Sequence, residues 1–350
     1  MPLIAHSNLP SFERLEKQGE TILSEERASH QAIRALHIGL LNMMPDSALE
    51  ATERQFFRLV GRSNQVAQLY IHPFSLSSIK RGKKATEHIK SHYKSFDEIK
   101  LQGLDALIIT GANVTDPDLQ LAPFYKELRE VVDWSYENVT STLCSCLATH
   151  AVLEFKYAQK RKPLGKKHWG VFPHQVTDRT HPLVKGVNTR FDVPHSRFNE
   201  ISRSQFEDAN IRVLAASKIG VHLAVSPDLF RIVFFQGHPE YDSISLLKEL
   251  KREVALYLEG GRSDYPPFPA NYLSPQCCAI LEEYKTRLHA KSATIKDFPE
   301  KLIMKTLDNT WHDSASAIIN NWIGCFYQVT NEDIKLPFME SVDPQNPLGL

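Results

Sequence analysis

Short apolar runs alternate with segments of helical periodicity along the first half of the chain. The apolar runs have the length of strands and lie at Leu36–Asn42, Val66–Ile71, Leu104–Thr110 and Val139–Cys144. The segments whose apolar residues recur at helical spacing are Glu53–Val60, Pro123–Asn138 and Leu147–Tyr157. A parallel strand is apolar along its whole length because helices cover both of its faces. The alternation therefore predicts a mostly parallel sheet with helices on both faces, a flavodoxin-like α/β fold.

The second half of the chain adds more strands and then becomes helical. The expected strands are Ile211–Ala215, His222–Val225 and Phe230–Phe235, and the expected helices are Ile244–Leu258, Gln276–Lys291 and Ser314–Val329. The proline-rich stretch Asp264–Pro275 must be extended or looped. We divide the chain into an N-terminal segment (1–34), an α/β domain (35–265) and a C-terminal helical extension (266–350) that packs on the same domain.

Composition and charge exclude several classes of function. Lys+Arg and Asp+Glu are both 41, so the formal net charge is zero, and no basic block suggests a nucleic-acid partner. The longest apolar runs, such as Ala35–Met44, are too short to span a membrane. The polar, glutamate-rich N-terminus is unlike a signal peptide. Five cysteines in 350 residues do not suggest a disulfide scaffold, so we expect a protein of the reducing cytosol.

Two cysteines lie close together in T-S-T-L-C-S-C-L-A-T-H, Thr140 to His150. Cys144 is the last apolar residue of a predicted strand, and packing in the core explains it. Cys146 falls between that strand and the next helix, at the carboxyl edge of the sheet, where α/β proteins place their sites. The helix N-terminus favours a thiolate there, as in a nucleophile elbow. Cys146 is therefore a candidate nucleophile, although this pattern alone also fits a structural cysteine.

A nucleophilic cysteine needs a base, and the sequence offers two histidines. His150 is nearer along the chain, but it lies one helical turn beyond Cys146 and is expected to face a neighbouring element. His238 follows the buried strand Phe230–Phe235, and Glu240 comes two residues later. A carboxylate at that spacing can orient an imidazole and hold its tautomer. A solvated surface turn would explain the tripeptide alone, but a second strand-end site opposite Cys146 favours the catalytic interpretation.

At this point the motifs resemble those of a known family. A cysteine elbow followed by H-P-E resembles the class I glutamine amidotransferases, and the finer match is to the homoserine O-acyltransferases (homoserine transsuccinylases) of methionine biosynthesis. The matching segments occur in family order: L-L-N-M-M-P (Leu40–Pro45), L-I-I-T-G-A (Leu107–Ala112), S-T-L-C-S-C (Ser141–Cys146), K-H-W-G-V-F-P-H (Lys167–His174), P-H-S-R (Pro194–Arg197), G-H-P-E-Y-D (Gly237–Asp242) and N-N-W-I (Asn320–Ile323). The resemblance covers nearly the whole chain and implies a class I glutamine amidotransferase-like fold.

The resemblance also implies roles for individual residues. Cys146 would be the acyl-thioester nucleophile, His238 the general base and Glu240 the acid that orients it. The substrate contacts it implies are Lys167, Ser196 and Arg252. A guanidinium suits the α-carboxylate of an amino acid because it binds both oxygens. L-homoserine and succinyl-CoA or acetyl-CoA would be the substrates, with no bound cofactor or metal, and a homodimer is possible.

The chain departs from the family pattern at four places. Leu147 follows the cysteine where the family has a large residue such as Trp, and Asp46-Ser47 replaces the lysine usual after Pro45. Thr115 occupies the position that distinguishes acyl donors, where Glu or Gly is typical. An uncharged residue there does not repel the free carboxylate of a succinyl group, so we favour succinyl-CoA over acetyl-CoA. Finally, residues 276–306 form an expected insertion.

The reaction we expect is acyl transfer in two stages. The thiolate of Cys146 attacks the acyl-CoA, and His238 then activates the homoserine hydroxyl. Candidates to hold the oxyanion are backbone N–H groups near Gly111, Ala112 and Leu147. Three alternatives stay open: L-serine as the acceptor, since one methylene discriminates weakly, a glutaminase or amidase, and a catalytically inactive binding protein.

Overall fold

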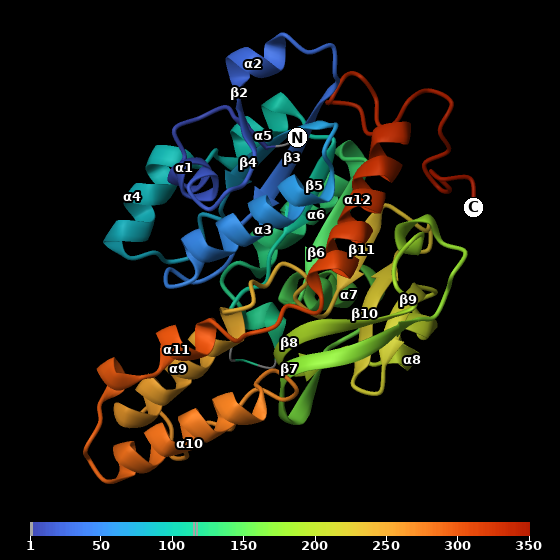
Figure 1. Cartoon of the computed structure of the whole chain (residues 1–350). Helices are drawn as coiled ribbons and strands as arrows, with labels where there is room; N and C mark the ends of the chain where they lie inside the picture. The colour runs from blue at the N-terminus through green and yellow to red at the C-terminus, as the bar shows by residue number, and fades with distance from the viewer. Residues whose placement is uncertain (1–2, 115, 117) are drawn as a thin grey trace.

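The computed structural model describes residues 3–114, 116 and 118–350, and its centre is a single 11-stranded sheet (Figure 1). The strand order is β2-β1-β4-β3-β5-β6-β11-β10-β9-β7-β8. The strands are β1 (Leu3–Ala5), β2 (Ile22–Ser24), β3 (Ala35–Leu41), β4 (Gln68–Phe74), β5 (Ala106–Ile109), β6 (Ser141–Ser145), β7 (Lys162–Val176), β8 (Arg190–Glu200), β9 (Arg212–Ser217), β10 (Gly220–Val225) and β11 (Ile232–Phe235).

The sheet is parallel over its larger part. Every neighbouring pair from β2 to β11 in that order is parallel, and the remaining pairs, from β11 to β8, are antiparallel. This arrangement confirms the predicted α/β class. Thr142 pairs with Ile232 and Ser145 with Phe235, so β6 and β11 end at the same level. The segments that follow these two strands therefore leave the sheet side by side.

Helices cover both faces of the sheet. The α-helices are α1 (Pro10–Glu16), α2 (Glu25–Ser29), α3 (Leu49–Ser63), α4 (Lys83–His92), α5 (Phe96–Gln102), α6 (Tyr125–Asn138), α7 (Leu147–Tyr157), α8 (Arg203–Asp208), α9 (Ser245–Leu258), α10 (Pro275–His289), α11 (Glu300–Met304) and α12 (His312–Val329). Short 3₁₀ turns are η1 (Leu119–Leu121), η2 (Pro182–Val184) and η3 (Ile295–Asp297). None of the helices within the described ranges is long and apolar enough to cross a membrane.

Alternate residues of the central strands fill two separate cores. On β5, Ala106 and Ile108 belong to the core with α3 and α12, and Leu107 and Ile109 belong to the core with α6 and α7. Successive side chains of a strand point to opposite faces, which divides the apolar residues in this way. The sheet is thus a central layer between two helical layers.

A third core lies at one end of the molecule, where α9, α10 and α11 pack together (Figure 1). Its buried residues include Leu247 and Val254 of α9, Leu281 of α10 and Ile303 of α11, and Trp169 of β7 joins them. The expected insertion, residues 276–306, forms most of α10, η3 and α11 and supports α9 from outside. The division of the chain into three segments stays a prediction, although β1 and β2 of segment 1–34 join the same sheet.

A cluster of three histidines lies near the N-terminal edge of the sheet, with His72 buried and His6 and His37 half-buried. His37 Nδ1 lies 2.9 Å from His72 Nε2, and the ring of His6 is tilted against that of His72 with the centroids 4.7 Å apart. Burial, together with the charges of Lys94 and the other two imidazoles, lowers the pKa of His72 to about 2. The folded chain therefore favours the neutral imidazole of His72.

We expect this cluster to make folding less favourable in mild acid. The pKa of His72 is depressed in the folded chain, so the unfolded chain binds more protons once the pH falls below about 6.5. The contribution of His72 to the free energy of unfolding is fully present above that pH and decreases below it. At about pH 5 we expect the free energy of unfolding to be lower by roughly 2 kcal/mol because of this side chain. Urea unfolding at about pH 7.5 and pH 5 measures the difference. His72→Gln should reduce the difference in free energy of unfolding between the two pH values, and His30→Gln, at an exposed position, should not. The same difference in both variants and in the unaltered chain would refute the assignment.

Candidate active site

The site lies where β6 and β11 end at the carboxyl edge of the sheet. Cys146 follows β6 directly, and His238 follows β11 after Gln236 and Gly237. The backbone N–H of Cys146 donates to Phe235 O at 2.7 Å, which joins the two strand ends. Two strands that are far apart in sequence thus bring the cysteine and the histidine to one place, as the strand-end pattern predicted.

Cys146 occupies a strained backbone conformation. Its φ is 51° and its ψ is −108°, and it stands at the N-terminus of α7. A non-glycine residue with positive φ costs free energy, and such residues concentrate at functional sites. Cys146 is half-buried, and Cys144 is fully buried in the core with α6 and α7. Burial raises the pKa of the Cys144 thiol far above its usual range, so its thiolate is strongly disfavoured.

Gly111 lies against the cysteine from the end of β5. A Cβ at this position would lie 3.5 Å from Cys146 Cβ and 3.9 Å from the backbone nitrogen of Leu147. Ala112 continues the same segment and is half-buried. The backbone of Gly111 therefore lies close to Cys146 and Leu147. That Gly111, Ala112 and Leu147 hold the oxyanion stays a prediction.

His238 and Glu240 form a buried pair. Nδ1 of His238 lies 2.8 Å from Glu240 Oε1, and the two side chains are 8% and 5% exposed. Burial alone would lower the pKa of His238, but the charges of Cys146 and Glu240 and hydrogen bonds to both raise that pKa well above its usual value. A raised pKa favours the imidazolium, so the histidine is suited to hold a proton beside the sulfur.

A tyrosine connects this pair to a second carboxylate. The ring of Tyr241 stacks on His238 with the centroids 4.3 Å apart. Its hydroxyl donates to Glu249 Oε1 at 2.7 Å. Neither Tyr241 nor Glu249 was singled out from the sequence. The available signal was the position of Glu249 on α9, one turn before Arg252 and on the same helix face.

The predicted substrate contacts gather around Glu249. Ser196 Oγ donates to its Oε2 at 2.7 Å, and Lys167 Nζ lies 3.5 Å from the same oxygen. Glu249 is 8% exposed, and its burial would raise its pKa; the charge of Lys167 and the hydrogen bonds from Tyr241 and Ser196 outweigh that effect and lower the pKa. Glu249 is thus a buried carboxylate that stays charged.

Arg252 stands apart from this group. It is exposed on α9, and its charge contributes to lowering the pKa of Lys167, after the larger effect of burial. The structure therefore places Lys167 and Ser196 around Glu249, and Arg252 on α9 outside that group. Their contact with a substrate stays a prediction.

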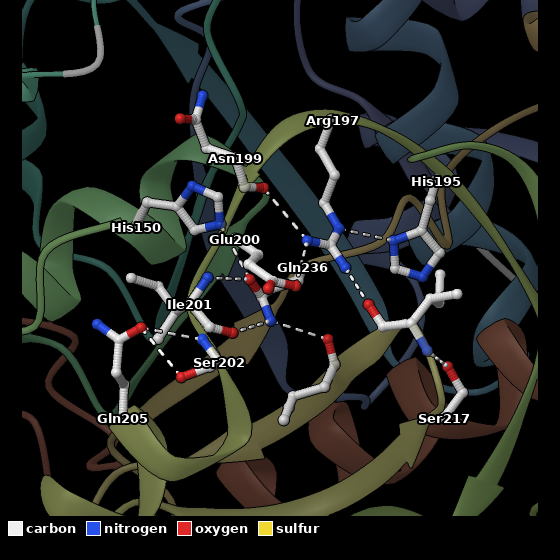
Figure 2. A network of polar contacts seen from close by, with 12 residues as sticks. His150, His195, Arg197, Asn199, Glu200, Ile201, Ser202, Gln205, Ser217 and Gln236 are labelled. Carbon is white, nitrogen blue, oxygen red and sulfur yellow. Dashed lines mark hydrogen bonds and ion pairs between the residues drawn. The ribbon is translucent and has the colours of Figure 1, made fainter. Parts of the chain in front are cut away.

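A network of hydrogen bonds centres on Gln236, the residue that follows β11 (Figure 2). The side-chain nitrogen of Gln236 donates to Ile201 O at 3.1 Å and to Val221 O at 2.9 Å. Its oxygen accepts from Ile201 N at 2.9 Å and lies 3.0 Å from His150 Nε2. Burial lowers the pKa of His150 to about 3. His150, the other candidate base, thus bonds the helix of Cys146 to the strand of His238.

The loop that departs from the family pattern is contacted by Arg81, which lies on the segment between β4 and α4. Arg81 donates to Asn42 O and Ser75 Oγ, both at 3.1 Å, and also contacts Met44 O and Asp46. It borders a cavity of about 520 Å³ that reaches Ala112 and Phe124.

Thr115, predicted to set the acyl donor, lies outside the described residues. Within residues 3–114, 116 and 118–350, no group of three or more His, Cys, Asp or Glu side chains could hold a metal ion.

Comparison with known proteins adds to this geometry. The family model for homoserine O-succinyltransferase matches residues 2–332. The chain belongs to the homoserine O-succinyltransferase family. Full-length relatives in this family include the homoserine O-succinyltransferases of Nitrosococcus oceani (63% identical), Thioalkalivibrio nitratireducens (61%) and Allochromatium vinosum (60%), in each case over 100% of this chain and 99% of the relative.

Solved structures of similar fold are much more distant. A glutamine amidotransferase from Thermotoga maritima is 9% identical with a TM-score of 0.42, over 84% of this chain and 98% of that one. A glutaminase domain of CTPS from Trypanosoma brucei is 13% identical with a TM-score of 0.42, over 68% and 98%. These values describe a distant likeness of fold and do not bear on the reaction.

Proposed function

We propose that this member of the homoserine O-succinyltransferase family transfers a succinyl group from succinyl-CoA to the γ-hydroxyl of L-homoserine, as a step of methionine biosynthesis in the cytosol. The observation that carries the proposal is the strained Cys146 beside the buried His238–Glu240 pair. In a chain of this family, that arrangement supports a thioester mechanism with Cys146 as the nucleophile.

In the first stage, His238 takes the thiol proton and the sulfur of Cys146 attacks the thioester carbonyl of the donor. Backbone N–H groups of Gly111, Ala112 and Leu147 stabilise the oxyanion. The tetrahedral intermediate then collapses and expels the CoA thiolate, which receives the proton from His238. Glu240 keeps Nδ1 of His238 occupied, so the other ring nitrogen performs both transfers.

In the second stage, homoserine takes the place of CoA. His238 removes the proton of its γ-hydroxyl, the oxygen attacks the thioester on Cys146, and the sulfur leaves. Glu249 suits the α-ammonium group, because a carboxylate has about four acceptor positions and three donors already use it. Arg252 suits the α-carboxylate, because it is exposed on the same face of α9 and can bind both oxygens.

The purified chain with succinyl-CoA and L-homoserine tests the proposal. We expect O-succinylhomoserine as the product, detected by mass spectrometry, and much slower transfer to L-serine. A separate reaction with glutamine and no acyl-CoA tests for glutaminase activity. Release of ammonia from glutamine, with no acyl transfer, would refute acyl transfer in favour of a glutaminase.

Arg252→Lys should raise the KM for homoserine far more than the KM for the donor. A point charge cannot replace a bidentate contact to a carboxylate, and we expect a loss of roughly 1.5–3 kcal/mol, about ten- to a hundredfold. Arg129→Lys, at an exposed position on α6, is the matched control and should leave both constants as they are. Unchanged homoserine kinetics in Arg252→Lys would remove this residue from the acceptor site.

Thr115→Glu should shift the donor preference toward acetyl-CoA. A glutamate would repel the free carboxylate of a succinyl group, and a like-charge contact away from water costs several kcal/mol. The measurement is kcat/KM for succinyl-CoA and for acetyl-CoA in both proteins. A higher value for acetyl-CoA in the unaltered chain would overturn the succinyl assignment and leave the thioester mechanism intact.

A further inference from the structure

The two stages of the proposed reaction indicate where the pantetheine and nucleotide parts of the acyl-CoA donor lie. The CoA sulfur receives its proton from His238, and the homoserine oxygen gives its proton to the same nitrogen. Both atoms must therefore occupy the same place beside the Cys146 thioester. On the proposed function, the pantetheine chain of the donor then leaves the site through the space that homoserine later fills, past Ser196 and Lys167.

A cavity opens in that direction. It has a volume of about 520 Å³, and Lys167 is one of its walls. Lys167 also contacts Glu249 at 3.5 Å, so the cavity adjoins the acceptor side of the site directly. Strand β7, which carries Lys167, and the proline-rich loop both line the cavity. Gly170 allows the loop to pack closely on β7, because a Cβ at this position would lie 2.1 Å from Ala270 O. Ala270 accepts a hydrogen bond from Val171 N and donates one to Trp169 O, on the two sides of Gly170.

The walls of the cavity are aromatic. Trp169, Phe172, Phe198 and Phe268 line it, and Phe198 is 63% exposed at its rim. A ring at a cavity rim offers a flat face for a planar ligand. Trp169 is 6% exposed, and its indole N–H has no hydrogen-bond partner within the described part of the chain.

Positively charged side chains lie among these aromatic rings. Lys166 is exposed on the cavity wall, and Lys167 lies over the Trp169 ring at 4.4 Å and the Phe198 ring at 5.4 Å. Arg262 also lines the cavity, but its guanidinium contacts Glu253 and Asp264. Lys166 is thus the wall cation best placed for an added anion. Aromatic faces beside a lysine are what a purine with phosphate groups requires.

We propose that this aromatic cavity binds the adenosine 3′,5′-bisphosphate end of the acyl-CoA donor. Two other cavities fit less well. One of about 720 Å³ shares Phe172 and Ile219 with the aromatic cavity. Its other walls carry Arg190, Arg203 and Lys218 and one further ring, His174, and none of its lining residues belongs to the site. The cavity beside Ala112 borders the oxyanion side and lies where the acyl chain points.

The experiment compares a complete donor with a truncated one. The readout is the ratio of kcat/KM for succinyl-CoA to kcat/KM for S-succinyl-N-acetylcysteamine, which lacks the nucleotide. In Phe198→Ala this ratio should fall about tenfold, because a base stacked on an aromatic ring loses its partner. Lys166→Glu should lower the ratio as well and should do so more strongly at low salt. Both side chains are exposed, so the variants are expected to fold.

The controls separate this inference from the proposed function. Lys218→Ala, in the basic cavity, should leave the ratio at the value of the unaltered chain. A ratio that falls in Lys218→Ala and not in Phe198→Ala or Lys166→Glu would place the nucleotide in the other cavity and overturn the inference. A ratio unchanged in all three would also overturn it. Failure of the unaltered chain to use either donor would instead refute the proposed function.

Discussion

Cys146→Ser is expected to abolish acyl transfer, and Cys144→Ser is expected to retain most of it. The two residues are neighbours in sequence, but β6 points Cys144 into the core and the strained turn places Cys146 beside His238. Serine has the shape of cysteine but is a far weaker nucleophile toward a thioester. Loss of a nucleophile that acts together with its base costs several orders of magnitude in kcat, so we expect at least about a thousandfold.

The measurement is kcat with succinyl-CoA and homoserine for both variants, with circular dichroism to show that each is folded. Cys144→Ser buries a hydroxyl where a thiol packed, and a loss of roughly 1–3 kcal/mol in stability is expected without a matching loss of kcat. A folded but inactive Cys144→Ser beside an active Cys146→Ser would reverse the assignment.

His238→Asn should have the second-largest effect. The imidazole moves a proton in both stages, and general acid–base catalysis contributes about a hundred- to ten-thousandfold. Glu240→Gln should cost less, because Glu240 acts on the substrate only through His238, by orienting its ring and raising its pKa. Single-turnover measurements can follow thioester formation and homoserine transfer separately.

We expect His238→Asn to slow both stages and Glu240→Gln to slow both by a smaller factor. In Glu240→Gln the pKa of His238 should fall, because one of the charges that raise it is gone. A His238→Asn enzyme that slows only one stage would show that a second base serves the other. His150 would then be the first residue to reconsider, although Gln236 occupies its Nε2.

The centre of the sheet was predictable from the sequence, and the strands at its two edges were not. Continuous apolar runs identify β3, β5, β6 and β11 because helices cover both faces of these strands. The hairpin of β7 and β8 was missed, since its prolines, histidines and charged residues break both strand patterns. The three-residue strands β1 and β2 are too short for any periodicity to show.

The candidate site divides in the same way. Cys146, His238 and Glu240 could be recognised because all three follow strand ends at one edge of the sheet. Glu249 and Tyr241 could not, because their importance depends on contacts between α9, β8 and the segment after β11. Lys167 and Ser196 were accessible only through the family resemblance, and the structure adds the buried carboxylate that brings them together.

Intact-mass spectrometry of the chain after mixing with succinyl-CoA, without an acceptor, tests the central claim most directly. The account predicts one added succinyl group, located on the peptide that contains Cys146, absent in Cys146→Ser and lost when L-homoserine is added. Turnover of both substrates with no such adduct, or an adduct on Cys144 that homoserine discharges, would contradict the thioester mechanism.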